Sequence, residues 1–244
     1  MKNEISDLKI MGEMTLAGGK YRDVAVMGEL TINGDLTCTD FKIMGQAHIN
    51  GNLTAREGKV SGKAVLDGAV SMDELKVQGQ VRIDKQARID RLRVQGQTSI
   101  GGDLKTEEID LQGELNVAGN CTAERFKARG AFTIDALLNA GDIDIRQYGP
   151  SSAKEIGGER IIVRRAPASV LWQFLKSIFL NLDFKDKFVT DSIEGDDITL
   201  EYTKAKVVRG NNVLIGNGCE IDLVEYKKTF EQTKDAKVGA NKKM

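Results

Sequence analysis

The chain has 244 residues and a formal net charge of −1 at pH 7, with 41% hydrophobic but only 5% aromatic residues. The balanced charge argues against a nucleic-acid-binding protein, which would carry a strongly basic surface. Residues 1–7 carry acids where a secretory signal needs an apolar core, so we expect no such signal. Cys38, Cys121 and Cys219 are far apart and odd in number, which favours reduced thiols in the cytoplasm.

A glycine recurs along the first half of the chain, after a first interval of 16 residues, at a constant interval of 17 residues. A fixed period of this length is typical of a chain that coils and stacks each turn on the previous one. The glycines are Gly12, Gly28, Gly45, Gly62, Gly79, Gly96, Gly113 and Gly130.

Between the glycines, apolar residues alternate with polar ones, which is the period of a strand with one buried face. Each repeat is predicted to hold about three short strands joined at corners, where glycine would adopt positive φ. We therefore predict an all-β parallel β-helix (a β-solenoid) of about 17 residues per turn, with one inserted amphipathic helix. Parallel crossovers favour right-handed winding. A thin core of this kind explains the few aromatic residues, because large rings would not fit.

The regular pattern stops where Gln147 replaces the expected glycine, and it returns in part after residue 187. The last residues are rich in lysine and poor in apolar side chains, which is typical of a mobile tail. We expect an N-terminal tail (1–7), a regular β-helix (8–146), an irregular turn and extra strand (147–168), an amphipathic helix and loop (169–187), C-terminal β-helix turns (188–228) and a disordered basic tail (229–244).

Residues 169–182 have apolar side chains at helical spacing, after Ser169 as a candidate N-cap. The segment is too short and too polar to span a bilayer. We expect it to pack on the solenoid flank or to cap an open end, and the alternatives are a helix lying in the membrane plane or binding a partner protein. The side chains that would make this contact are Leu171, Trp172, Phe174, Leu175, Ile178 and Phe179.

Two repeated phrases, VMGELTINGDL at 26–36 and IMGQAHINGNL at 43–53, resemble the bactofilins, a bacterial family of polymer-forming cytoskeletal proteins. The resemblance covers residues 8–146, and residues 153–228 look like the C-terminal extension of Bacillus-type members. It implies a right-handed β-helix that forms filaments without nucleotide and scaffolds cell shape, envelope or motility machinery. The implied partners are the protein itself, a membrane surface, and envelope or motility proteins, at a cytoplasmic or membrane-associated location.

The sequence contains few side chains in patterns that are typical of a catalytic site. His48, the one histidine, lies on the outward side of its strand, between Thr31 and Val65 of the neighbouring turns, without an acid or nucleophile in that column. The hexapeptide repeats of β-helical acyltransferases do not match an interval of 17 residues. No Cys or His pair has metal-ligand spacing. We therefore expect no enzyme activity, cofactor, metal, small-molecule substrate or nucleic-acid partner.

Two outward columns are of interest for binding. The first is basic, with acids at the adjoining corner, which predicts a self-neutralised face; a stripe for an anionic partner is the alternative. Its cations are Lys42, Lys59, Lys76 and Arg93, and its acids are Asp40, Glu57, Glu74 and Asp90. The second lies just before the corner glycines and contains Met11, Met27 and Met44, followed by Gln78, Gln95 and Gln112. The glutamines predict an amide ladder, while the methionines either fill the corner or form an outward strip for a lateral partner.

The ends of a solenoid differ from its interior, because the terminal turns have an unpaired backbone edge and expose a slice of core. Each bond gained there contributes about 0.5–1.5 kcal/mol, against about 4–15 kcal/mol of freedom lost on association. The N-terminal end is the more open, since seven residues before Leu8 are too few for a lid. We expect end-to-end assembly through residues 8–24, with contacts from Leu8, Ile10, Met14 and Leu16. The alternative is a capped, non-polymerising scaffold for a membrane or protein.

Overall fold

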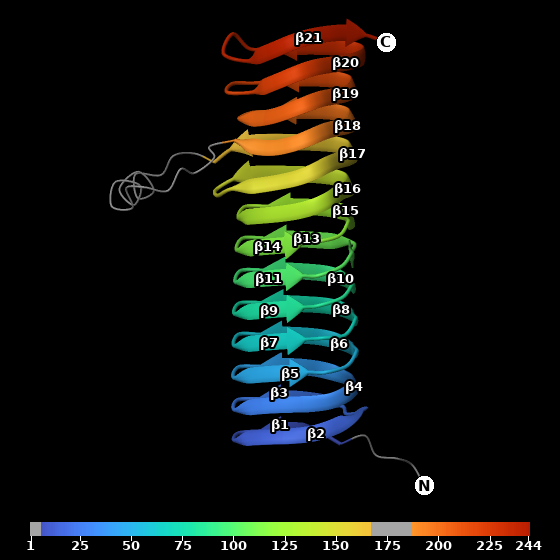
Figure 1. The fold of residues 1–244 in the computed structure, drawn as a ribbon, viewed down its shortest axis with the longest axis vertical. Helices are drawn as coiled ribbons and strands as arrows, with labels where there is room; N and C mark the ends of the chain where they lie inside the picture. The colour runs from blue at the N-terminus through green and yellow to red at the C-terminus, as the bar shows by residue number, and fades with distance from the viewer. Residues whose placement is uncertain (1–5, 167–186) are drawn as a thin grey trace, which may run out of the picture.

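The computed structural model describes residues 6–166 and 187–244. In this part of the chain every regular element is a β-strand, and the strands stack into one straight rod of about 13 turns (Figure 1). The N- and C-terminal strands lie at opposite ends of the rod. The strands are β1 (Leu8–Ile10), β2 (Glu13–Lys20), β3 (Asp23–Val26), β4 (Glu29–Ile43), β5 (Gln46–Ile49), β6 (Leu53–Val60), β7 (Lys63–Leu66), β8 (Val70–Val77), β9 (Gln80–Ile83), β10 (Ala87–Val94), β11 (Gln97–Ile100), β12 (Leu104–Lys105), β13 (Glu108–Leu111), β14 (Glu114–Val117), β15 (Cys121–Ala128), β16 (Ala131–Gln147), β17 (Ser151–Arg165), β18 (Phe188–Leu200), β19 (Thr203–Ile215), β20 (Glu220–Gln232) and β21 (Lys237–Lys243).

All strand pairs are parallel, and each strand from β3 to β20 lies between the strands of the turn before and the turn after. Within β4, β6 and β8, for example, Leu36, Leu53 and Val70 lie directly above one another. Side-chain hydrogen bonds between successive turns join residues 17 apart over much of the rod. Between β18 and β19 the same kind of bond joins residues 15 apart. The glycine repeat therefore predicts the stacking correctly.

Each turn has three sides, separated by corners where the alternation of buried and exposed residues restarts. In the turn that starts at β5, the first side is Gln46–Ile49, and β6 supplies the second side and the third side with a restart between them. Three turns further along, the same two sides are separate strands in β12 and β13. We call these the first, second and third sides of a turn from here on.

The core is a set of columns in which side chains from successive turns stack. One column on the third side contains Phe41, Gly58 and Leu75 in that order. A Cβ atom on Gly58 would lie 2.7 Å from Leu75 Cδ1 and 2.9 Å from Met72 Sδ, so the missing side chain leaves room for its larger neighbours. The core also accommodates large rings, contrary to expectation: Phe41, Phe126, Phe132 and Phe188 are fully buried.

The corner glycines are explained by close approach of the backbone and not by positive φ. From Gly28 to Gly130, a Cβ atom on each would fall far inside contact distance of the carbonyl oxygen of the corner glycine one turn before. Among the glycines of the described residues, only Gly34 and Gly218 have positive φ, at 124° and 71°. The corner position therefore needs glycine because successive turns touch there. Gly12 is the exception, with nothing within 4 Å of an added Cβ, since no described turn lies before it.

A second corner, after the first side, is held by side chains that replace the strand ladder. The Asp35 carboxylate accepts a hydrogen bond from the Asn52 backbone N–H at 2.8 Å. The Asn52 side chain in turn accepts one from the Ala69 N–H at 2.9 Å, one turn further on. Asp and Asn at this corner thus satisfy backbone donors that no strand partner reaches.

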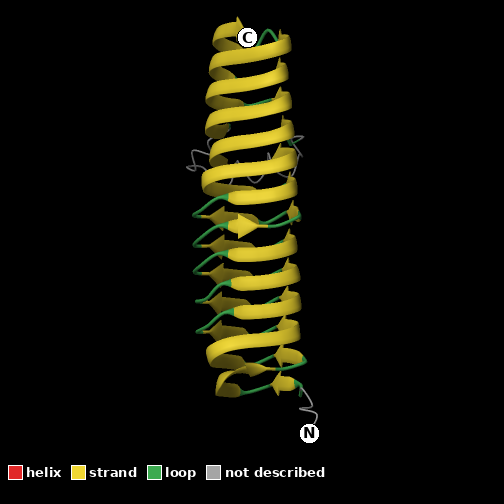
Figure 2. Cartoon of the chain, turned by 90° about the vertical axis from the view of Figure 1, so that its right-hand side faces the viewer, coloured by secondary structure: helices red, strands yellow, loops and turns green. Residues whose placement is uncertain are grey.

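The prediction of an inserted helix is wrong for the described residues, whose fold is an all-β solenoid. Residues 6–166 and 187–244 contain strands and no helix (Figure 2), and β17 pairs directly with β18 across the position of the insertion. Each strand is therefore joined to its neighbours by ladder hydrogen bonds rather than by helix packing. The expected helix at 169–182 lies outside the described residues. The right-handed winding stays a prediction.

The C-terminal half is also more regular than the sequence indicates. Residues 147–168 were predicted as an irregular turn with one extra strand, but β17 alone spans Ser151–Arg165 and covers all three sides. Residues 229–244 were predicted as a disordered tail. They instead contain the end of β20 and the whole of β21, which pairs with β20 from Lys237 to Lys243. Lysine side chains are tolerated there because they point outward while the backbone completes the ladder.

Substitutions of glycine at two equivalent corners test whether glycine is needed there for the close approach of two turns or for its conformational freedom. Gly45→Ala is expected to destabilise the fold by about 1–3 kcal/mol, because the added methyl overlaps the turn before it. Gly12→Ala is expected to change stability by less than about 0.5 kcal/mol, because it meets nothing. Urea unfolding followed by circular dichroism measures both, and equal losses at the two positions would contradict this explanation.

Thr98 offers a stabilising substitution. It is fully buried between Val81 and Leu115, and its hydroxyl has no hydrogen-bond partner among the described residues. Thr98→Val is therefore expected to stabilise the fold by about 1 kcal/mol, because it removes an unsatisfied polar atom at nearly constant shape.

The matched control is Thr106, whose hydroxyl lies 3.1 Å from the Asp90 carbonyl and 3.3 Å from that of Glu108. Thr106→Val should lower the midpoint of the same urea transition while Thr98→Val raises it. A shift in the same direction for both variants would show that the hydroxyl bonds do not decide the outcome.

Candidate assembly surfaces

The first turn exposes side chains that are core residues everywhere else. Met14 is 44% exposed, whereas Leu30, directly above it in the next turn, is 0% exposed. Leu16 is half-buried, and its neighbour Ile32 is fully buried. The first turn therefore presents an apolar slice of core at the N-terminal tip.

The third side of this tip is formed by β1. Leu8 and Ile10 lie in two core columns. In the next turn these columns continue with Val24 and Val26 of β3. Leu8 is half-buried and Ile10 is 3% exposed. The other edge of β1 pairs with no strand of the described residues, so its backbone donors and acceptors face away from the rod. The four residues predicted as the assembly end thus lie together at the tip.

A salt bridge fixes the start of this turn. The Arg22 guanidinium donates to both carboxylate oxygens of Asp7, each at 2.9 Å, and the Arg22 N–H donates to the Ser6 carbonyl. The hydrogen bond and the positive charge of Arg22 lower the pKa of Asp7 below its ordinary value. The pair is exposed, so its contribution to stability is small. It nevertheless holds the residues just before β1 against the next turn.

The methionines before the corner glycines face outward. Met11, Met27 and Met44 are 79%, 50% and 60% exposed, and they lie in successive turns along one edge of the rod. Further along this edge, the Ser61 hydroxyl donates to Gln78 at 3.1 Å and the Gln78 amide donates to Gln95 at 3.4 Å. Gln78 and Gln95 therefore form part of the predicted ladder, and no hydrogen bond between the described side chains extends it to Gln112. The methionines are a free apolar strip, which we call the methionine strip.

The basic column is largely neutralised by neighbouring acids. Lys42 lies 3.6 Å from Asp40, and Lys76 lies 2.9 Å from Glu74. Glu74 also lies 3.3 Å from Arg91, which occupies the acidic column where Asp90 was predicted. The hydrogen bond from Lys76 and the positive charges around it lower the pKa of Glu74. Three of the four predicted cations thus lie within 4 Å of an acid, one carboxylate serves several of them, and Lys59 forms no salt bridge with a described residue.

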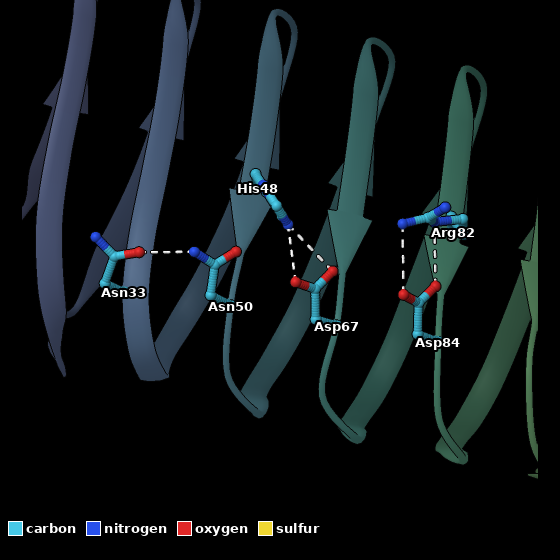
Figure 3. A network of polar contacts seen from close by, with 6 residues as sticks. All are labelled: Asn33, His48, Asn50, Asp67, Arg82 and Asp84. Carbon is cyan, nitrogen blue, oxygen red and sulfur yellow. Dashed lines mark hydrogen bonds and ion pairs between the residues drawn. The ribbon is translucent and has the colours of Figure 1, made fainter.

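His48 has an acidic partner that the sequence does not reveal. Its Nε2 atom lies 2.9 Å and 3.1 Å from the two carboxylate oxygens of Asp67 (Figure 3). Asp67 lies one turn further on and across the corner, outside the column of His48. The same face carries the pairs Asn50–Asn33 at 2.6 Å and Arg82–Asp84 at 3.1 Å. Each pair is a separate contact on the exposed face. The three pairs follow one another along the rod and do not converge on one point, as the groups of a catalytic centre would.

The three cysteines are free and buried. Burial, together with the nearby carboxylates of Asp40 and Asp23, raises the pKa of the Cys38 thiol to about 12. Burial alone raises the pKa of Cys121 to about 12. Among residues 6–166 and 187–244, no cluster of His, Cys, Asp or Glu is placed to hold a metal ion. In that same part of the chain, no helix has the length and hydropathy needed to cross a membrane.

The predicted membrane or capping helix cannot be placed, because its six contact residues lie outside the described residues: Leu171, Trp172, Phe174, Leu175, Ile178 and Phe179. The flanking strands β17 and β18 lie in the C-terminal half of the rod and not at either tip (Figure 1).

The fold and its surfaces define a parallel β-solenoid with an open apolar tip, a class whose unpaired edges favour association. A family model described as "Bactofilin: Polymer-forming cytoskeletal" matches residues 24–122. Residues 24–122 are therefore similar to the bactofilin family, and the resemblance drawn from the repeated phrases is confirmed over this part of the chain. Both findings agree with a structural, self-assembling protein.

Two relatives from Bacillus subtilis (strain 168) match part of the solenoid. The chain is 40% identical to the uncharacterized protein YhbF over 92 residues, which is 37% of this chain and 34% of that protein. It is 36% identical to the uncharacterized protein YhbE over 112 residues, which is 46% of this chain and 44% of that protein. The chain thus matches less than half the length of either relative. No solved structure matches it.

Labelling of the buried thiols can report whether the stacked turns are intact. At pH 8 the folded protein is expected to leave Cys38 and Cys121 unlabelled by a thiol reagent, because a thiol with a pKa of about 12 holds little thiolate. Urea should expose all three cysteines to rapid labelling, and Ser61→Cys, at an exposed corner, should label without urea. Fast labelling of Cys121 in the folded protein would contradict the sealed core.

Proposed function

We propose that this protein is a structural subunit that assembles end to end, without nucleotide, through its first turn. The observation that carries the proposal is the 44% exposure of Met14 at a column position that is 0% exposed in the next turn. A second copy placed on the tip would bury this slice as the interior turns bury theirs. The rods would serve as a scaffold for cell shape, envelope or motility machinery, the roles that the family resemblance implies.

The tip has both contributions that association needs. Leu8, Met14 and Leu16 offer apolar area, and the unpaired edges of β1 and β2 offer backbone hydrogen bonds. Each such bond contributes about 0.5–1.5 kcal/mol net, so several bonds plus the apolar area offset an association cost of about 4–15 kcal/mol. Neither contribution requires a bound cofactor.

The methionine strip supports a second, lateral contact in the same proposal. Met11, Met27 and Met44 form a line of exposed flexible side chains that begins at the tip and continues along one edge. Thioether side chains adapt to varied partners. A neighbouring rod or an envelope protein would find there an apolar strip that the remainder of the edge, with its glutamines, does not offer.

The end contact is tested by variants that leave the rod intact. Leu8→Asp places a charge on the half-buried tip, and Gly12→Ala adds a methyl where the isolated rod has open space. Both are expected to keep the circular dichroism of the wild type and to abolish rods longer than one molecule. The measurement is sedimentation together with negative-stain electron microscopy.

The matched control is Ala25→Asp, which places the same charge on the outward face of β3, one turn inside the tip. It should assemble as the wild type does. Filaments that persist in both tip variants would show that the first turn is not the contact. Wild-type protein that stays monomeric at high concentration would favour the capped scaffold instead.

A further inference from the structure

One edge of the rod, the corner between the third side and the first side, changes its residue type along the axis. Met44, Gln112 and Arg129 occupy equivalent positions there, because each donates its backbone N–H to the last core residue of the third side one turn before. Arg146 and Arg164 follow Arg129 in the next two turns. The edge therefore carries methionines, then glutamines, and then three arginines on successive turns, which we call the arginine edge.

The described side chains leave the arginine edge without direct ion pairs. Arg129, Arg146 and Arg164 form no salt bridge with a described residue. By contrast, Arg160, in the same turn as Arg164, lies 2.6 Å from Asp142. Successive turns are about 4.8 Å apart, and like charges directly opposite each other on adjacent strands repel and destabilise the sheet. The column therefore carries a repulsion that a bound anion would remove.

The acids beside the column do not compensate it fully. Glu201 follows Arg164 in the next turn, but its carboxylate accepts a hydrogen bond from the Arg165 backbone N–H at 3.3 Å. Asp144 lies on the third side beside the column and can offset one of the three positive charges. Glu159, in the same turn as Arg164, lies at another corner, between the second and third sides. An excess of positive charge therefore remains on the edge.

The stacked turns fix the spacing of the three arginines, and their side chains reach the surface. Arg146 and Arg164 are joined by the parallel ladder of β16 and β17. Arg164 is exposed, and Arg129 and Arg146 are half-buried. Tyr148, at the same corner, is 45% exposed. A partner would thus meet a row of cations on a rigid backbone, which lowers the entropic cost of binding.

The composition of the edge indicates a protein partner. Arginine and tyrosine are enriched at the centres of protein interfaces. Arginine also binds a carboxylate through two parallel hydrogen bonds, which lysine cannot do. An anionic lipid surface attracts lysine and arginine alike, so a column of arginine alone, next to an exposed tyrosine, favours protein carboxylates as the ligand. The net charge of −1 also disfavours a nucleic acid.

We propose that the arginine edge binds an acidic segment of a partner protein, with the Asp or Glu carboxylates of that segment on Arg129, Arg146 and Arg164. The three arginines span two strand spacings, about 10 Å, which about three residues of an extended chain cover. The edge lies on the side of the rod and away from its first turn. The inference therefore goes beyond the proposed end-to-end assembly and does not depend on it.

The test is the fluorescence anisotropy of a fluorescein-labelled oligoglutamate peptide, titrated with the protein at low salt. The wild type is expected to bind this peptide. The triple variant Arg129→Gln/Arg146→Gln/Arg164→Gln is expected to bind it at least about tenfold more weakly, because the charge-assisted hydrogen bonds to the carboxylates are lost.

The matched control is Lys59→Gln/Lys63→Gln/Arg88→Gln, which removes the same charge from exposed cations outside the edge. It should bind the peptide as the wild type does. Circular dichroism checks that both triple variants are folded. The single variant Arg146→Glu, expected to weaken binding at least about fivefold, gives a second measurement if the arginine triple variant does not fold.

Equal binding by the two triple variants, or no binding by the wild type, would overturn the proposal. A pelleting assay with vesicles of phosphatidylcholine and phosphatidylserine shows whether the edge recognises lipid headgroups instead. A wild type that pellets with these vesicles through the arginine edge and does not bind the peptide would also overturn the protein partner.

Discussion

The constraint on which the rest of the structure depends is the contact between successive turns at the corner glycines. At each of them from Gly28 to Gly130, the Cα of one turn lies so close to the carbonyl of the turn before that a methyl group has no room. This contact fixes the spacing and the register together, because a shift of one residue would place a side chain where only hydrogen fits. The ladders of Asn, Asp and Gln and the core columns follow from the register that the glycines impose.

Such a stack has a consequence for its ends. Interior turns satisfy each other, so the rod can lengthen by adding turns without changing its cross-section. A turn from another molecule satisfies the tip as well as a turn from the same chain does, provided that its period and columns match. The partly exposed Met14 and the half-buried Leu16 are core positions that lack this neighbour among the described residues. The architecture therefore supports the self-association that we propose.

Much of this could be predicted from the sequence, because a repeat encodes the same environment many times. The period, the parallel register, the outward columns and the composition of the tip all follow from the spacing of glycine and apolar residues. The reason for glycine was wrong, since close approach between turns is a property of the stack and not of one repeat. The Asp67 partner of His48 was missed because it lies across a corner, outside any single column.

The irregular part of the chain was harder to predict for a physical reason. Turns of 15 residues and a bulge after Tyr226 change the glycine interval, so the pattern that marks the first half is lost while the stacking continues. The strand β21 has mostly polar and exposed side chains, among which only Val238 is half-buried. Composition alone therefore suggested a disordered tail where the backbone ladder adds another strand.

Helical reconstruction of assembled protein by electron cryomicroscopy tests the central claim most directly. The account predicts filaments one solenoid wide, in which strands about 4.8 Å apart continue across the junction that each first turn forms. Junctions that leave the first turn exposed, bundles held only by their sides, or a protein that forms no filament would contradict it.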